Sequence, residues 1–390
     1  MRIMLAIVGV AALAGAASAQ RVEYAGKVTA AESPYALHQA GDARYLALTP
    51  LLCPNDCFAD VLDLATRTVH RVTTPVATLE HRFGHRVGPA FWLDGQVASY
   101  TPERTGLFLS DDKDGTTRYS YAELDTATGR LVRDVELGTF KGDADQYFAG
   151  TDSERGVAWF YLEQYRGPRR PDHGYRRERS ASSIAFRKLD LRTLALSDVI
   201  EVDLPERVQS GPLEIQLFVH PADDFSHFAV VEYWENPHPI TPAAGVYIVD
   251  PVARTSFAVA APPVAYGAAF SRDGKYLYMA SDDDGSLSRV DLAKRAIDRV
   301  VTGPKVARIA VAPGDRGLVM FGTSKRYVTF ALPGLTAPRE LRHVPELAPA
   351  FDELFDAGVI SRDGRYIVIP QRRGETLGDT DDYVIGRITE

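Results

Sequence analysis

A short phrase recurs along this chain of 390 residues, and it constrains the fold more than any other feature. The two clearest copies, residues 269–278 and 359–368, read AFSRDGKYLY and VISRDGRYIV. Each is an apolar stretch, a polar turn that contains glycine, and a second stretch that alternates. Glycine supplies the positive φ of a tight turn, and aspartate can bond the backbone of such a turn. The phrase therefore predicts a β-hairpin that occurs repeatedly.

Weaker copies extend through the chain at intervals of about 40 to 70 residues, which suit four-stranded units. The turn aspartates of these copies are Asp42, Asp94, Asp152, Asp224, Asp273, Asp315 and Asp363. A second marker, an apolar strand that ends in aspartate, follows most copies, and we interpret its aspartates as turn caps: Asp63, Asp125, Asp190, Asp250 and Asp291. Seven units predict an all-β fold, a seven-bladed β-propeller that forms one domain over residues 20–390.

The last unit is one strand short, because the chain stops soon after residues 382–388. A propeller with a missing outer strand would carry an open sheet edge. Residues 21–29 form an apolar, alternating segment that belongs to no other unit. We therefore expect this N-terminal strand to pair within the last blade and close the ring.

The first 19 residues have the pattern of a signal peptide: Arg2, an apolar run over residues 3–16, and Ala-Ser-Ala at the end. We expect cleavage before Gln20 and a periplasmic or secreted mature protein. The apolar run is short for a bilayer span, and no later segment is long enough either. A formal net charge of −8 argues against a nucleic-acid partner.

The chain has two cysteines, Cys53 and Cys57, in the sequence Cys-Pro-Asn-Asp-Cys. An even, sparse count in an oxidising compartment predicts one local disulfide. The loop that it closes is so short that the bond adds little to global stability.

Residues 270–281, with the later Val290 and Asp291, resemble the YVTN-type repeat, a WD40-like repeat of bacterial exported β-propellers. That repeat has a turn similar to Ser-Pro-Asp-Gly, followed by Tyr-Val-Thr-Asn. Arg272 stands where the repeat has proline, and residues 279–281 depart from its tail. The resemblance implies the propeller fold and says little about function, because such propellers include binding proteins, lactonases and quinoprotein subunits.

Propeller topology separates the connections of each unit onto two faces. Turns between strands one and two, and between strands three and four, lie on what we call the short-turn face. The other connections lie on the opposite, loop-rich face, which is expected to hold nearly all the surplus length: Pro50–Asp56, Thr101–Arg118, Glu163–Ser183, Tyr233–Gly245 and Gln371–Asp382. Long loops on a rigid scaffold usually carry binding, so we expect the working surface there.

The largest insertion, residues 165–179, holds six arginines and two acidic residues. Arginine matches carboxylates and phosphates, which favours an anionic small ligand or a protein partner with an acidic surface. The alternative is a solvated loop that balances nearby acids. Changes at Arg272 and Lys275, on the short-turn face, are expected to leave binding unaffected. The candidate binding residues are Arg166, Arg169, Arg170, His173, Tyr175, Arg176, Arg177, Trp234 and His238.

No catalytic nucleophile motif is present. His81 and His85 have i,i+4 spacing, but Gly84 argues against a helix, so we assign no metal ligand and no catalytic residue. The leading hypothesis is a non-catalytic binding propeller. The alternatives are a structural assembly subunit or an enzyme with its site at the mouth of the central channel. Such an enzyme would be a metal-assisted lactonase-type hydrolase or a quinoprotein dehydrogenase component, and the sequence identifies no cofactor.

Overall fold

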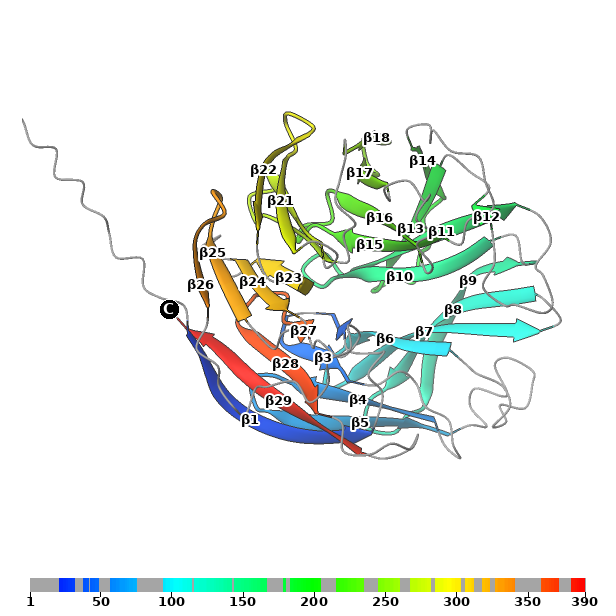
Figure 1. Cartoon of the computed structure of the whole chain (residues 1–390). Coiled ribbons are helices and arrows are strands. Elements are labelled where there is room, and N and C mark those ends of the chain that lie inside the picture. Colours follow the sequence, from blue (N-terminus) through cyan, green and yellow to red (C-terminus); the bar gives the residue numbers. More distant parts are fainter. Residues whose placement is uncertain are drawn as a thin grey trace, which may run out of the picture.

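The computed structural model arranges β-sheets around a central axis (Figure 1). It describes residues 21–31, 38–41, 43–48, 57–75, 94–113, 116–141, 144–166, 178–179, 183–204, 215–234, 245–259, 267–281, 285–302, 306–311, 318–322, 327–340, 359–371 and 380–389. Within this part of the chain, no helix is long and apolar enough to cross a bilayer.

The described strands form seven antiparallel sheets, most of them built from four strands that are consecutive in the chain. The first three sheets contain β2 (His38–Gln39), β3 (Tyr45–Ala47), β4 (Cys57–Asp63) and β5 (Thr68–Thr74); β6 (Asp94–Tyr100), β7 (Arg104–Lys113), β8 (Thr116–Asp125) and β9 (Leu131–Phe140); and β10 (Ala144–Asp152), β11 (Val157–Arg166), β13 (Ser183–Asp190) and β14 (Ile200–Asp203), with the short β12 (Glu178–Arg179) paired to β11.

The next three sheets repeat the same order of strands. They contain β15 (Ile215–Pro221), β16 (Phe228–Trp234), β17 (Val246–Asp250) and β18 (Thr255–Ala258); β19 (Gly267–Phe270), β20 (Tyr276–Ala280), β21 (Ser286–Asp291) and β22 (Ala296–Thr302); and β23 (Val306–Val311), β24 (Leu318–Gly322), β25 (Tyr327–Ala331) and β26 (Thr336–Glu340). The last sheet has the order β1 (Arg21–Ala31), β29 (Thr380–Thr389), β28 (Tyr366–Gln371) and β27 (Val359–Ile360).

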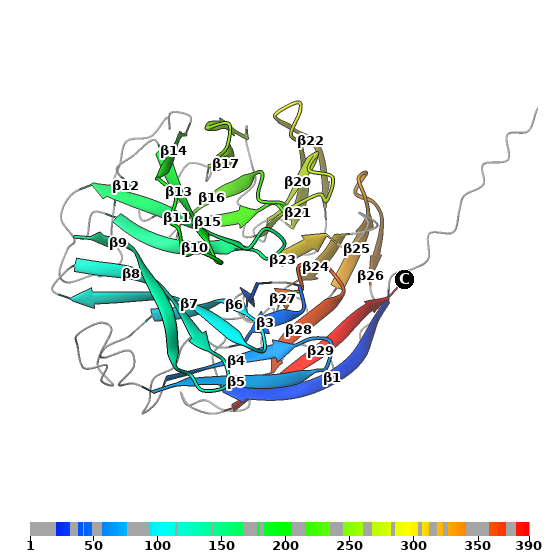
Figure 2. The same ribbon diagram turned by 180° about the vertical axis from the view of Figure 1, so that it is seen from behind.

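Sheets that are neighbours in the chain are also neighbours in space. The first strands of successive units contact one another from β6 through β10, β15, β19 and β23 to β27, and β3 contacts β6. The ring is completed where β1 contacts β5 (Figure 2). The prediction of an all-β β-propeller is confirmed.

The N-terminal strand joins the last sheet, as the short C-terminal unit predicted. β1 pairs antiparallel with β29, from Arg21 opposite Thr389 to Ala31 opposite Thr380. The side chains of Lys27 and Thr29 each contact the buried Asp382, at 2.8 Å. The last sheet is therefore assembled from both ends of the described chain (Figure 1).

The hydrophobic core lies between the sheets. Alternate residues of each strand are buried against the next sheet, so each apolar cluster combines residues of two neighbours. One cluster joins Leu46 and Leu62 of the first unit to Val368, Tyr383 and Ile385 of the last sheet. Another packs Trp159 and Phe186 against Phe228. These contacts bury the faces that the alternating pattern makes apolar.

The two clearest phrases form the same turn. In residues 271–276, the Ser271 hydroxyl donates to Asp273 at 2.7 Å and accepts from the Tyr276 N–H at 2.9 Å. Gly274 has a φ of +67° and donates its N–H to the Ser271 carbonyl at 3.0 Å. Residues 361–366 repeat these bonds, and Gly364 has a φ of +68°. Glycine is favoured at this position because most other residues adopt such a φ only at a cost.

The second marker also has the predicted role. Each marker aspartate ends the third strand of its unit. Its side chain accepts hydrogen bonds from backbone N–H groups of the turn that follows. Val252 and Ala253, for example, donate to Asp250 at 2.9 and 2.8 Å. Equivalent bonds occur at the other markers: Asp63, Asp125, Asp190 and Asp291. The interpretation of these residues as turn caps is confirmed.

Two predictions about the second unit were wrong. Asp94 begins β6 and does not lie in a turn; the turn of this unit spans residues 101–103. The expected long loop Thr101–Arg118 is mostly hairpin, because β7 and β8 are ten residues each. The surplus length here extends strands, since residues 105–109 and 119–124 are consistently buried and favour continued pairing. Asp42 and Asp315 lie outside the described residues.

Cys57 begins β4, is fully buried, and is not a free thiol. Cys53 lies outside the described residues, so the pairing of Cys53 with Cys57 stays a prediction. His81, Gly84 and His85 also lie outside the described residues.

We predict that deletion of residues 21–31 destabilises the whole ring. The deletion exposes the edge of β29 and leaves the buried Asp382 without Lys27 and Thr29. The melting temperature should fall by about 10 °C or more, with concentration-dependent association. Addition of a peptide of residues 21–31 should restore the melting temperature, whereas a scrambled peptide should not. An unchanged melting temperature after the deletion would refute this model of closure.

We also predict a pH-dependent contribution from Asp63. Arg44 donates two bonds to its carboxylate, at 2.8 and 2.6 Å, which lowers the pKa of Asp63 from 3.8 to about 2. The ionised form therefore stabilises the fold above about pH 4, and this contribution is lost as the pH falls through about 2. Asp63→Asn should lower the free energy of unfolding by about 2 kcal/mol at pH 7.

Chemical denaturation at several pH values measures this contribution. The difference between Asp63→Asn and the wild type should shrink toward zero at the lowest pH. Asp250→Asn is the matched control, because Asp250 caps the equivalent turn of the fourth unit and its described bonds are only to backbone N–H groups. A difference that did not change with pH would contradict the prediction.

Candidate functional site

A cavity opens at the short-turn face of the ring. Its volume is about 680 Å³, and it is lined by turns of the first, third, fourth, fifth and last units. Those turns supply five arginines and five acidic residues: Arg44, Arg155, Arg272, Arg362 and Arg365, with Asp152, Glu154, Asp223, Asp224 and Asp363. Ala43, Leu64, Ala65 and Tyr366 add less polar surface. Residues far apart in the sequence thus form one concave, charged surface at the end of the axis.

Arg362 links the turn of the last sheet to three other units. Its guanidinium donates to the Thr151 carbonyl at 2.9 Å and to the Asp223 carbonyl, and it lies over the Phe225 ring at 4.8 Å from the centroid. Its backbone N–H donates to the Gln39 side chain at 2.9 Å. Arg362 therefore fixes the turns at this end of the ring relative to one another.

Arg272, in the fifth unit, contacts both Arg362 and Asp223. It donates to the Arg362 carbonyl at 2.9 Å, and a terminal nitrogen lies 3.4 Å from the Asp223 carboxylate. The Arg362 Nε lies 3.7 Å from the other oxygen of the same carboxylate. Two guanidinium groups thus share one carboxylate, which we call the axial arginine pair.

The wall formed by the third unit carries its own ion pair. Arg155 contacts the carboxylate of the buried Asp152 at 2.9 Å and also donates to the Asp224 carbonyl at 2.6 Å. The Asp224 side chain accepts bonds from the N–H and hydroxyl of Ser226, at 3.0 and 2.7 Å. These bonds hold the third and fourth units together at the rim of the cavity.

A smaller cavity of about 290 Å³ shares Arg362 and Asp223 with the first. Its other lining residues come from first strands and adjoining turns, among them Gln39, Gln96, Phe148, Thr151 and Phe225. Arg362 therefore lies between the open cavity at the short-turn face and a second space lined by the inner strands.

The structure places two residues of the expected loop-rich site, each at the end of a strand. Arg166 ends β11 and Trp234 ends β16. The other expected binding residues lie outside the described residues: Arg169, Arg170, His173, Tyr175, Arg176, Arg177 and His238. For these residues, binding on the loop-rich face stays a prediction.

The analysis of the sequence did not identify the axial residues as a site. Arg272 was expected to be neutral for binding, yet it lines the cavity, whereas Lys275 does not. A signal was present, because both clear copies of the repeated phrase read Ser-Arg-Asp-Gly where the YVTN-type turn has proline. The convergence of Arg272 and Arg362 on Asp223 depends on ring geometry, which the linear sequence does not give.

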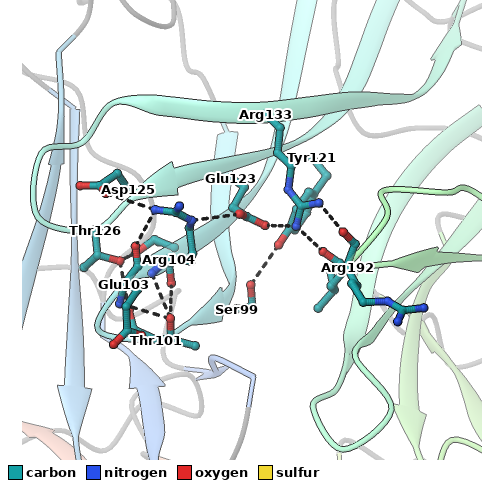
Figure 3. Close-up of polar contacts among 12 residues, drawn as sticks. Ser99, Thr101, Glu103, Arg104, Tyr121, Glu123, Asp125, Thr126, Arg133 and Arg192 are labelled. Carbon is teal, nitrogen blue, oxygen red and sulfur yellow. Dashed lines mark hydrogen bonds and ion pairs between the residues drawn. The ribbon is translucent and has the colours of Figure 1, made fainter.

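A second polar cluster, between the second and third sheets, has a structural role (Figure 3). Glu123 contacts Arg104 at 3.3 Å and Arg133 at 2.7 Å. Arg133 also donates to the Leu191 carbonyl at 2.6 Å, across the sheet boundary. Burial raises the pKa of the neighbouring Tyr121 to about 12. The cluster satisfies a buried carboxylate and ties two sheets together.

Within the described part of the chain, no group of three or more His, Cys, Asp or Glu residues has the arrangement of a metal site.

We predict that Arg362→Gln destabilises the ring. The change removes bonds of a charged group to Thr151 and Asp223 and the contact with Phe225. The free energy of unfolding should fall by about 2 kcal/mol. Arg365→Gln makes the same charge change in the same turn, where the side chain is 69% exposed, and should alter stability by less than about 0.5 kcal/mol. Equal effects in denaturant titrations would contradict a specific role for Arg362.

Comparisons with known proteins support the fold and leave the family open. No family model and no curated protein sequence matches the chain. A chain of the mitotic checkpoint complex is similar over 100% of this chain and 99% of its own, at 12% identity and a TM-score of 0.53. Two structures of AztD from Citrobacter koseri, one of them the apo form, cover 76% of this chain, and 71% and 72% of their own. Their identities are 13% and 12%, and their TM-scores are 0.42 and 0.41. At such identities the likeness concerns the fold alone, and the YVTN-type resemblance stays a prediction.

Proposed function

We propose that this chain is an exported, seven-bladed binding propeller that takes up a small polar ligand at the short-turn face and does not act as a catalyst. The observation that carries the proposal is the charged cavity at the end of the axis. Export rests on the signal-like pattern of residues 1–19. Each of the seven sheets would be one blade of a rigid ring.

The size and placement of the cavity support binding of a small molecule. Ligand sites usually measure about 300–1,000 Å³ and occur where several structural units meet. At about 680 Å³, this cavity is in that range, and turns of five units line it. Its walls are held by ion pairs and backbone bonds, such as those of Arg155 and Arg362, so the site is largely preformed. A preformed site loses little conformational entropy on binding.

The charges that line the cavity favour a polar ligand. An apolar ligand would remove water from these five arginines and five acidic residues without forming hydrogen bonds to them. Arginine side chains recognise carboxylates and phosphates, and the neighbouring acids can accept bonds from hydroxyl or amino groups of the same ligand.

A second candidate function is binding of an acidic protein partner on the loop-rich face. The observation that favours it is β12, which pairs with β11 through Tyr165 opposite Arg179 and Arg166 opposite Glu178. This pairing extends the second strand of the third unit into the arginine-rich insertion. The arginines at Arg169, Arg170, Arg176 and Arg177 would then supply charge-assisted contacts whose strength falls with salt.

The cavity proposal is tested by a bulky substitution at its rim. Ala65 lines the cavity at the second position after the capping Asp63, so Ala65→Trp should obstruct it. Val252 occupies the same position after Asp250 and does not line the cavity, so Val252→Trp is the matched control. Both positions are exposed, so neither variant should unfold the ring.

Native mass spectrometry after incubation with the small-molecule fraction of a cell extract provides the measurement. The wild type and Val252→Trp should retain an adduct. Ala65→Trp should bind the same ligand with an affinity about tenfold or more lower. An adduct that all three proteins retain equally would place binding outside the cavity and contradict the proposal.

A further inference from the structure

We infer that the smaller cavity, which we call the inner chamber, is a separate binding site for an uncharged planar molecule. That molecule carries an amide-like edge, in which a hydrogen-bond donor lies beside an acceptor. The volume of the chamber, about 290 Å³, is close to the lower end of the range for ligand sites and suits a molecule the size of a nucleobase. Binding there would be independent of the proposed uptake at the short-turn face.

A β-bulge shapes the wall that the third unit contributes to the inner chamber. Along a regular strand, successive side chains point to opposite faces of the sheet. The register of β10 against β11 shifts between Phe148 and Gly150, and residues 148–151 all line the chamber. Gly150 has a φ of +147°, and a Cβ on this residue would lie 3.1 Å from the ring of the buried Phe225. Glycine therefore lets β10 pack closely against Phe225, so that backbone and ring together form the wall.

The walls of the inner chamber favour an uncharged ligand. Among the described residues that line it, only Arg362 and Asp223 ionise, and their side chains contact each other at 3.7 Å. The Arg362 guanidinium also donates to the carbonyls of Thr151 and Asp223. Phe148 and Phe225 add apolar surface. A charged group would lose water here without meeting a charge that is not already paired, whereas an apolar ring would pack against the phenylalanines.

Hydrogen bonds within the ring occupy most polar side chains of these walls. The Gln39 amide donates to a carbonyl of β3 at 2.6 Å and accepts from the Arg362 N–H at 2.9 Å. The Thr151 hydroxyl donates to a carbonyl of β6 at 2.7 Å. Gln96, in β6, is half-buried and lines the chamber, and its amide forms no hydrogen bond within the described part of the chain. Gln96 is therefore the side chain that remains for recognition of a ligand.

The amide of Gln96 specifies the chemistry of its partner. A glutamine side chain presents an N–H donor beside a carbonyl acceptor in one plane. Its complement is a group with an acceptor beside a donor, such as a primary carboxamide or the edge of adenine, which glutamine binds through two hydrogen bonds. A planar ring that carries such an edge would satisfy the amide and cover the apolar wall at the same time.

Saturation-transfer NMR titration of the mature protein with nicotinamide, and separately with adenine, tests this site. We expect saturable binding of at least one of them, and the tighter one shows whether the edge is that of a carboxamide or a nucleobase. Nicotinate replaces the carboxamide of nicotinamide with a carboxylate, and purine lacks the amino group of adenine. Each should bind at least about tenfold more weakly than its counterpart.

Substitution of Gln96 identifies the group that recognises the probe. Gln96→Met keeps the length of the side chain and removes its hydrogen-bonding groups, so the affinity should fall by about tenfold. Gln146→Met is the matched control. Gln146 also lies in the first strand of its unit, and its buried amide has no partner within the described residues, but it does not line the chamber. Gln146→Met should bind like the wild type, and melting temperatures show that each ring is folded.

Absence of saturable binding of both nicotinamide and adenine would overturn the inference, as would equal affinities in the wild type and Gln96→Met. Nicotinate that bound as tightly as nicotinamide would show recognition of a negative charge and would also overturn it. Loss of the probe from Ala65→Trp without loss from Gln96→Met would place it in the larger cavity. In that outcome the proposed function stands and the inference is wrong.

Discussion

The pairing of β1 with β29 is the constraint on which the rest of the structure depends. It joins the start of the described chain to its end over eleven and ten residues, respectively, and supplies the outer strand of the last sheet. The core lies between neighbouring sheets, so each sheet is buried only while the ring is closed. Closure also fixes the last unit beside the first. The turns at the end of the axis can then meet.

Arg362 shows how ring geometry converts a repeated turn into a site. In the sequence it belongs to a second copy of the phrase that contains Arg272, and both copies form the same serine–aspartate–glycine turn. In the ring, the two arginines approach from different units and share Asp223. The same turn thus provides local stability through its serine, aspartate and glycine, and provides charge at the axis through its arginine. The proposed ligand site follows from this second use.

The sequence predicts the elements better than the site, for a physical reason. Turn chemistry is local, so the turns at Gly274 and Gly364 and the caps at Asp63 and Asp250 can be predicted from adjacent residues alone. The closing strand follows from an incomplete last unit. Strand length is harder to predict from the sequence, because burial against other sheets extends β7 and β8 through a segment expected to be a loop. The cavity combines residues of five units, and only their arrangement in space brings them together.

Hydrogen–deuterium exchange, followed by mass spectrometry of the mature protein with and without the ligand fraction that the wild type retains, tests the account most directly. It reports protection at both faces of the ring in one experiment. Binding in the cavity predicts protection of the turns at residues 152–155, 223–226, 272–276 and 362–366. Protection confined to residues 163–183 and 233–245 would place the ligand on the loop-rich face and contradict the account.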